Sequence, residues 1–175
     1  MNRNTKIIVI VIILLTVTTA IGAFFNMRYS EERRTSLEAA EISVIVDGSE
    51  AKRFNMESLA ELGSEEFSAK LKSSIMESPE EHTYTGIALK ELFTSAGISL
   101  EDRSRVITYS ADGYAVPLKI KEIQENDNIY LVFKDNGDYL RLYGEKDGQG
   151  PYMIVVRGDR YSQRWAKYVV ELVVE

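Results

Sequence analysis

Hydrophobic and polar positions divide the chain into three regions. The stretch from Ile7 to Phe25 holds no charged residue, and as a helix it would be about 28 Å long, close to the hydrocarbon thickness of a bilayer. A short stretch rich in charge follows it. After that, short segments alternate between apolar and polar positions, which is typical of strands with one buried face. The pattern predicts a membrane-spanning segment (residues 1–27), a juxtamembrane linker (28–40) and one folded domain (41–175).

The apolar segment also predicts where the protein resides. Its length favours a retained anchor over a cleaved signal peptide, for which Ala20 and Gly22 would offer the small residues of a cleavage site. Arg3 and Lys6 precede the segment and three arginines follow it, so the positive charges do not fix its orientation. A short basic start before a long apolar run is typical of a signal-anchor. We therefore expect a single-pass protein of the cell membrane whose domain lies on the extracytoplasmic side.

Alternation and turn dipeptides predict the strands of the domain. Asp112-Gly113 and Asn136-Gly137 are strong signals for the turns of two hairpins. The expected strands or strand pairs lie within residues 41–48, 104–120, 128–142 and 168–174, and residues 152–159 are expected to form a strand followed by a loop. Residues 65–75 fit either a strand or a helix, and residues 78–82 are expected to form a polar loop.

Few segments have helical periodicity. Residues 55–62 predict a short helix capped by Asn55, and residues 85–98 predict the clearest helix, with Gly97 at its C-terminal cap. Residues 121–127 predict a helical turn. A small number of helices among short strands indicates an α+β domain with a mixed or largely antiparallel sheet.

Composition narrows the chemistry. The chain has no cysteine, which excludes disulfides, zinc–thiolate sites and cysteine nucleophiles within it. Its one histidine, His82, lies among acidic residues, and no Gly-x-Ser-x-Gly motif surrounds a serine, so we interpret His82 as a solvent-exposed surface residue. The net charge of −6 argues against a nucleic-acid partner, which would require a basic surface.

One cluster of positive charge stands out in this acidic chain. Arg157, Arg160, Arg164 and Lys167 surround Trp165, the only tryptophan. Guanidinium groups suit phosphate or carboxylate ligands. The alternative is that these cations pair with nearby acids while Trp165 packs the last strand onto the core. Residue chemistry alone favours this structural role.

Five segments together resemble a known family. They are YTGIALKELFTSAGI (84–98), VITYSADGYAVPL (106–118), VFKDNGDYL (132–140), GPYMIVV (150–156) and RWAKYVVELVV (164–174). Their order and spacing resemble the molybdopterin-binding domain of the sulfite oxidase family, and more closely its small, stand-alone, membrane-anchored relatives. The resemblance covers about residues 41–175. It implies the α+β sulfite oxidase fold with mixed and antiparallel sheets, and molybdopterin as the candidate cofactor.

The chain departs from this family at the metal ligand. In the catalytic members a cysteine thiolate ligates molybdenum, and the corresponding stretch here is KLKSSIMES (70–78). Ser73 and Ser74 stand near the expected place. A serine hydroxyl is a poor substitute for a thiolate because its pKa is far higher and its oxygen is a harder donor.

The carboxyl-terminal segment matches the family in part. Arg164 beside Trp165 resembles the basic residue that precedes a tryptophan in the enzymes and contacts the cofactor. The resemblance therefore implies Arg164 alone as a cofactor-binding residue. The positive charge of the cluster adds Arg157, Arg160 and Lys167 as weaker candidates.

These observations predict a membrane-anchored domain of the oxidoreductase molybdopterin-binding type that is not catalytic. It would bind a small anionic ligand or a protein partner in the cell envelope. The alternative is a molybdopterin-dependent oxidoreductase, or a subunit of one, with unusual metal ligation. A third hypothesis is an envelope assembly protein that recruits a partner through an exposed sheet face or edge.

Overall fold

The structure, a computed structural model, describes residues 2–175. The chain divides into two compact units, the first ending at Glu38 and the second running from Ala39 to Glu175.

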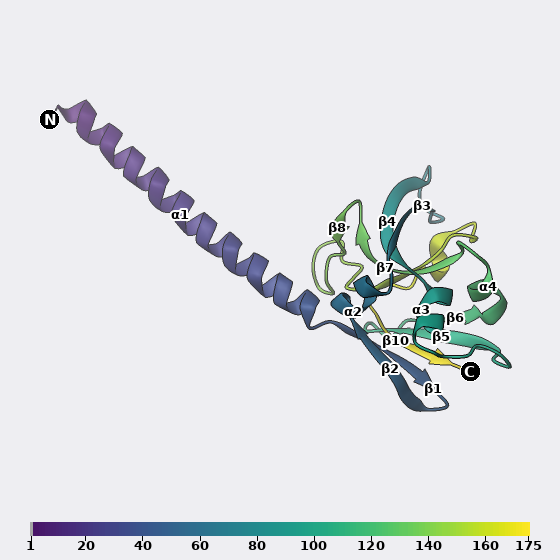
Figure 1. Cartoon of the computed structure of the whole chain (residues 1–175). Coiled ribbons are helices and arrows are strands. Elements are labelled where there is room, and N and C mark those ends of the chain that lie inside the picture. The colour runs from purple at the N-terminus through teal and green to yellow at the C-terminus, as the bar shows by residue number, and fades with distance from the viewer. Residues whose placement is uncertain (1) are drawn as a thin grey trace. The chain divides into compact units, whose positions relative to one another are not determined.

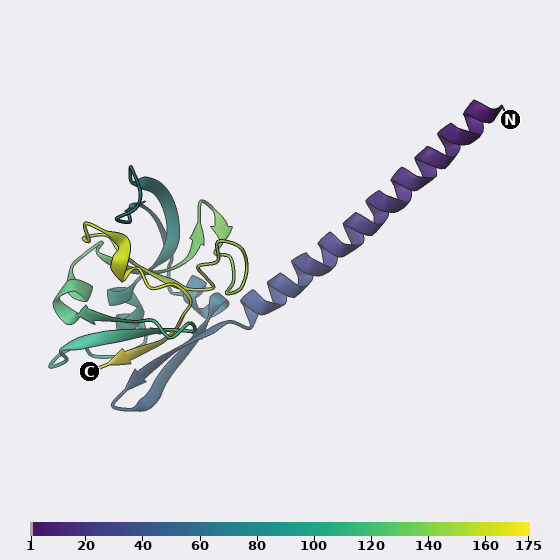
Figure 2. The same cartoon turned by 180° about the vertical axis from the view of Figure 1, so that it is seen from behind.

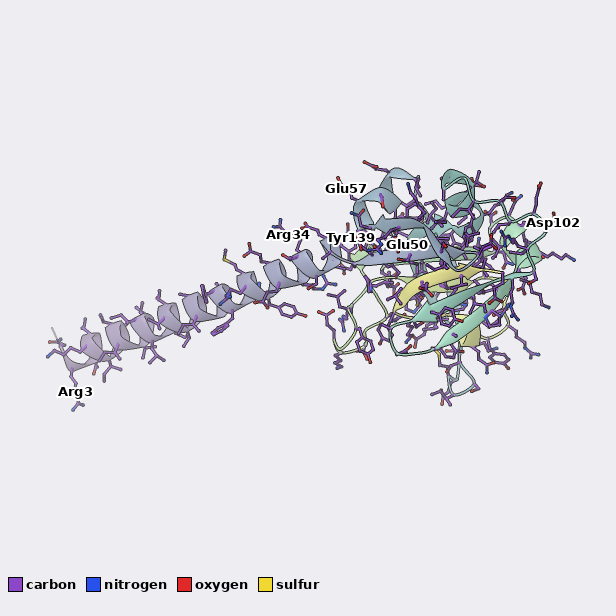
Figure 3. All side chains as sticks on the ribbon, turned by 90° about the horizontal axis from the view of Figure 1, so that it is seen from below. Arg3, Arg34, Glu50, Glu57, Asp102 and Tyr139 are labelled. Carbon is purple, nitrogen blue, oxygen red and sulfur yellow. The ribbon has the colours of Figure 1, made fainter. Side chains whose placement is uncertain are left out.

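The first unit is one long helix, α1 (Arg3–Glu38), drawn in purple in Figure 1. The helix is long and apolar enough to cross a membrane. Its side chains point outward along its whole length, from Arg3 to Arg34 (Figure 3). Two exposed ion pairs one turn apart, Arg28–Glu32 at 4.0 Å and Arg34–Glu38 at 3.7 Å, support the charged end of the helix. Most of the predicted linker is therefore helical.

The second unit contains two five-stranded sheets, and the first of them is mixed. Its strand order is β2-β1-β10-β5-β6, and β1 runs parallel to β10 while the other pairs are antiparallel. These strands are β1 (Glu41–Val46), β2 (Ser49–Asn55), β5 (Arg105–Ser110), β6 (Ala115–Lys119) and β10 (Val169–Val174). β2 was not predicted, because its residues are mostly exposed and polar and show no apolar alternation.

The second sheet is antiparallel and strongly curved at β4 (Figure 1). Its order is β3-β4-β7-β8, and β9 pairs with β7 beside β8. These strands are β3 (Glu65–Leu71), β4 (Glu80–Ala88), β7 (Ile129–Asp135), β8 (Asp138–Tyr139) and β9 (Met153–Val156). The first five residues of β7 and all of β9 are buried, so both faces of these strands are covered.

Short helices complete the domain. They are α2 (Met56–Glu61), α3 (Leu89–Ser95), α4 (Ile120–Gln124) and the 3-10 turn η1 (Ser162–Arg164). Asn55 caps α2 as predicted: its Oδ1 accepts from the Ser58 N–H at 2.9 Å, and the Ser58 hydroxyl oxygen accepts from the Asn55 N–H at 2.9 Å. This reciprocal pair satisfies two amide groups that a helix start leaves free.

The predicted hairpins at Asp112-Gly113 and Asn136-Gly137 are confirmed, and residues 65–71 form a strand. Two predictions were wrong. The helix expected over 85–98 covers only Leu89–Ser95, because residues 85–88 belong to β4, and the loop expected at 78–82 gives way to β4 from Glu80 onward. Gly86 explains the first error: a Cβ there would lie 2.7 Å from the Val132 Cα, so the glycine permits a close approach of β4 to β7.

This approach makes Gly86 a test of the second sheet. We expect Gly86→Ala to lower the free energy of unfolding by about 1–3 kcal/mol, because the backbone of β7 would have to move. Unfolding of the full-length protein in detergent, followed by fluorescence of the buried Trp165, measures this change. Gly22→Ala is the matched control, since nothing lies within 4 Å of that position. An unchanged unfolding midpoint for Gly86→Ala would contradict the close approach.

Candidate functional site

The segment between β9 and β10 lies beside the end of β3. Figure 2 shows it in yellow on the same side of the domain as the turn between β3 and β4. Two hydrogen bonds fasten it there: the Lys72 N–H donates to the Ser162 hydroxyl oxygen at 2.9 Å, and the Ser162 N–H donates to the Lys72 carbonyl at 2.8 Å. Residues about ninety positions apart are thereby held side by side.

Trp165 anchors the same segment to the core of the domain. Its side chain is buried, and the indole N–H donates to the Val156 carbonyl at 3.0 Å. Its ring meets Tyr84 edge to face, with 5.8 Å between the centroids. This geometry is a favourable aromatic contact with a satisfied polar group. Trp165 therefore packs the chain that leads into β10 onto the core.

Arg164 is held between two carboxylates. Its guanidinium donates twice to Glu122 on α4, at 3.0 Å each, and twice to Asp159. These bonds raise the pKa of Arg164 above its ordinary value and lower the pKa of the Glu122 carboxyl below 4.5. Arg164 thus ties the loop to α4, and its donors already face these two acids.

The other two arginines of the cluster, Arg157 and Arg160, are exposed, and each lies over an aromatic ring. The Arg157 guanidinium carbon is 5.5 Å from the centroid of the Phe67 ring, and Arg157 also donates to the Asp127 carbonyl at 3.1 Å. Arg160 lies 5.5 Å from the centroid of the Tyr161 ring. Stacking on a ring positions a guanidinium while leaving most of its donors open to a ligand.

An open pocket of about 400 Å³ lies beside these arginines. It is lined by Ser68, Ala69, Lys70, Lys72, Pro79, Glu81, Arg157, Asp159 and Arg160. Four cations therefore face two carboxylates, and one of those, Asp159, is already neutralised by Arg164. The pocket carries an excess of positive charge.

The structure separates the four cations predicted from the sequence. Arg157 and Arg160 line the pocket, Arg164 supports the loop behind it, and Lys167 is exposed and does not line it. Lys70 and Lys72 also line the pocket, but they were not among the site residues predicted from the sequence. The signal was present in the alternating Lys-Leu-Lys of residues 70–72, which places both lysines on one side of a strand.

His82 is not the exposed surface residue that its acidic neighbours suggested. It lies on β4 with its side chain 17% exposed, its Nδ1 is 2.9 Å from both carboxylate oxygens of Asp135, and its ring stacks on Tyr84 at 5.5 Å. The prediction failed because His82 stands in a strand, where β7 and the aromatic face of the sheet cover it.

The donor set does not fit the metal of the cofactor that the family resemblance implies. The chain has no cysteine to supply a thiolate. Within residues 2–175, no group of three or more His, Cys, Asp or Glu side chains is arranged to hold a metal ion. Ser73 and Ser74 offer only hydroxyls, which are harder and far less acidic donors than a thiolate.

Comparison with known proteins supports the fold. No protein-family model matches the chain, and no curated protein matches it in sequence. The crystal structure of the sulfane dehydrogenase SoxCD from Paracoccus pantotrophus is similar, with a TM-score of 0.63 and 17% identity. The match covers 79% of this chain and 39% of that chain. The likeness shows the fold alone, and it confirms the α+β, sulfite-oxidase-like fold.

The two ion pairs of Arg164 predict a pH-dependent contribution to stability. We expect Arg164→Ala to lower the free energy of unfolding by about 1–3 kcal/mol near pH 7, because two partly buried carboxylates lose their partner. The pKa of Glu122 is depressed below 4.5 in the folded state. The stabilisation is therefore present above that pH and is lost as the pH falls through the lower, folded value.

Urea unfolding at several pH values between 7 and 3 measures this dependence. The difference between the wild type and Arg164→Ala should shrink towards acid. Arg141→Ala is the control, since Arg141 forms an exposed pair with Asp147 at 3.6 Å and such pairs contribute little. A difference that stays constant or grows in acid would contradict the role given to Arg164.

Proposed function

We propose that this chain is a membrane-anchored binding domain that uses a sulfite-oxidase-like fold to hold an anionic ligand. It does so on the extracytoplasmic side and without the molybdenum catalysis of that family. The observation that carries the proposal is the pocket lined by Lys70, Lys72, Arg157 and Arg160 in a chain that has no thiolate to offer a metal.

The cations of the pocket come from two segments that meet only in the folded chain. Lys70 and Lys72 belong to β3 and the residues just after it, while Arg157 and Arg160 belong to the loop after β9. Like charges gathered in this way repel one another. Bound phosphate or carboxylate groups would relieve this repulsion and accept charge-assisted hydrogen bonds from the guanidinium forks.

The anchor supports a place at the membrane. The apolar part of α1, from Ile7 to Phe25, suits a bilayer. Because the chain has no cysteine, an introduced one reports topology directly. We expect a maleimide that does not cross membranes to label Ala51→Cys, at an exposed site of β2, in intact cells. Asn4→Cys should react only after permeabilisation, and the reverse pattern would place the domain in the cytoplasm.

Anion binding tests the proposal itself. Titration of the full-length protein in detergent with pyrophosphate and with citrate should give saturable binding to one site. We expect the Arg157→Ala, Arg160→Ala double variant to weaken it about tenfold or more, because two charge-assisted contacts are lost. Lys167→Ala, which removes a cation outside the pocket, should leave affinity unchanged. Equal loss in both variants, or no binding to the wild type, would refute the pocket.

The metal and pterin content of the same protein, purified from its own membranes, separates the two candidate functions. Elemental analysis for molybdenum and tungsten, and fluorescence of oxidised pterin released on denaturation, give the stoichiometry. We expect no stoichiometric metal. About one equivalent of both would instead establish the molybdopterin-dependent alternative. Pterin without metal would identify the bound anion and support a binding role.

A further inference from the structure

We propose that the outer edge of β3 receives an extended acidic segment of a partner protein, which adds to the second sheet as a further strand. This inference rests on the proposed anion-binding function and names its ligand. β3 lies at one border of its sheet and pairs only with β4. The pocket meets this border at Ser68, Ala69 and Lys70.

The hydrogen bonds of β4 show which backbone groups of β3 point outward. Thr83 on β4 turns both of its groups towards β7: its carbonyl accepts from the Asn136 N–H at 2.7 Å, and its N–H donates to the Asn136 Oδ1 at 3.1 Å. In an antiparallel strand the N–H and C=O of one residue point to the same side and alternate along the chain. Ser68, which stands opposite Thr83, therefore points its own N–H and C=O away from β4.

The same alternation applies to Glu66 and Lys70, and then to Lys72. At Lys72 the outward groups are already used, because its N–H and C=O both bond to Ser162. Within residues 2–175, no backbone partner meets the outward groups of Glu66, Ser68 or Lys70. The loop after β9 thus pairs with the outward backbone groups of Lys72, as a neighbouring strand would. The outward groups of the three preceding residues in this alternation, Lys70, Ser68 and Glu66, remain open to a further strand.

These open N–H and C=O groups of β3 favour a peptide over a small anion as the ligand. A phosphate or carboxylate ion has only acceptors, so it would use the outward N–H groups and leave the outward carbonyls unmatched. An extended peptide supplies donors and acceptors in alternation, which is how strand addition gains affinity. A free edge beside a pocket is the geometry that this mode of binding requires.

The charges around the edge specify an acidic segment. Four cations lie around the carboxyl-terminal end of β3: Lys70, Lys72, Arg157 and Arg160. Glu66 lies near the amino-terminal end of the strand. Complementary charge fixes partner choice and register more than it adds affinity. Aspartate or glutamate side chains of the added strand would therefore lie beside Lys70, with uncharged residues beside Glu66.

A labelled acidic strand peptide, such as fluorescein-Thr-Val-Thr-Val-Asp-Val-Glu-Val-Asp, tests this inference with the full-length protein in detergent. Its matched control has the same sequence but carries N-methyl groups on alternate residues, with one control peptide for each of the two alternations. We expect the unmodified peptide to bind, and one of the two methylated peptides to bind at least tenfold more weakly. Lys70→Glu should abolish binding, while Lys167→Glu should not change it.

The outcomes separate this inference from the proposed function. If both methylated peptides bind as well as the parent, the pocket holds carboxylates without strand addition, and the inference fails while anion binding stands. If neither the peptide nor pyrophosphate binds, the proposed function fails as well.

A second copy of the chain is the competing occupant of the edge. Two β3 strands paired antiparallel about Ser68 would place Glu66 of each copy opposite Lys70 of the other. A dimer seen by light scattering, broken by Lys70→Glu and restored by Glu66→Lys, Lys70→Glu together, would assign the edge to self-association and overturn the acidic partner.

Discussion

The pair of hydrogen bonds between Lys72 and Ser162 is the contact on which the candidate site depends. It joins the end of β3 to the segment that leads into β10. These bonds hold the arginines of the loop after β9 beside the lysines at the end of β3. Trp165 holds the same segment from below by its bond to the Val156 carbonyl. The pocket is therefore a consequence of how the last strand is brought into the first sheet.

Arg164 shapes the charge of that pocket without facing a ligand. Asp159 lines the pocket, and an unpaired carboxylate there would offset part of the cationic charge. By pairing with Asp159, and through Glu122 with α4, Arg164 removes that offset and orients the loop at the same time. Desolvation of the two partners opposes much of the attraction in such an ion pair, so its net gain in stability is small. Its larger effects are to orient the loop and to neutralise the charge of Asp159. The arginine nearest the tryptophan thus acts as a positioning residue.

Local signals in the sequence correctly predicted the features that depend on a few neighbouring residues, namely a helix cap and two hairpin turns. The Asn55 cap and both Gly-containing hairpin turns follow from φ/ψ preferences and short-range hydrogen bonds, and all are confirmed. Residues 85–98 misled because their apolar spacing fits a helix, while the contact of Gly86 with β7 lies more than forty residues away. His82 misled for the same reason, since Asp135 covers it from another strand. The site required pairings that no local pattern contains.

The chain has a sulfite-oxidase-like fold but no cysteine that could supply a thiolate ligand to a metal. A thiolate–metal centre needs one soft ligand at one place, and a chain without that ligand cannot form it. A cationic pocket beside an open edge needs only backbone geometry and several charges, each of which contributes a part. The curved sheet, the loop after β9 and the edge of β3 can therefore serve recognition without any change in topology. The fold and the function therefore depend on different residues.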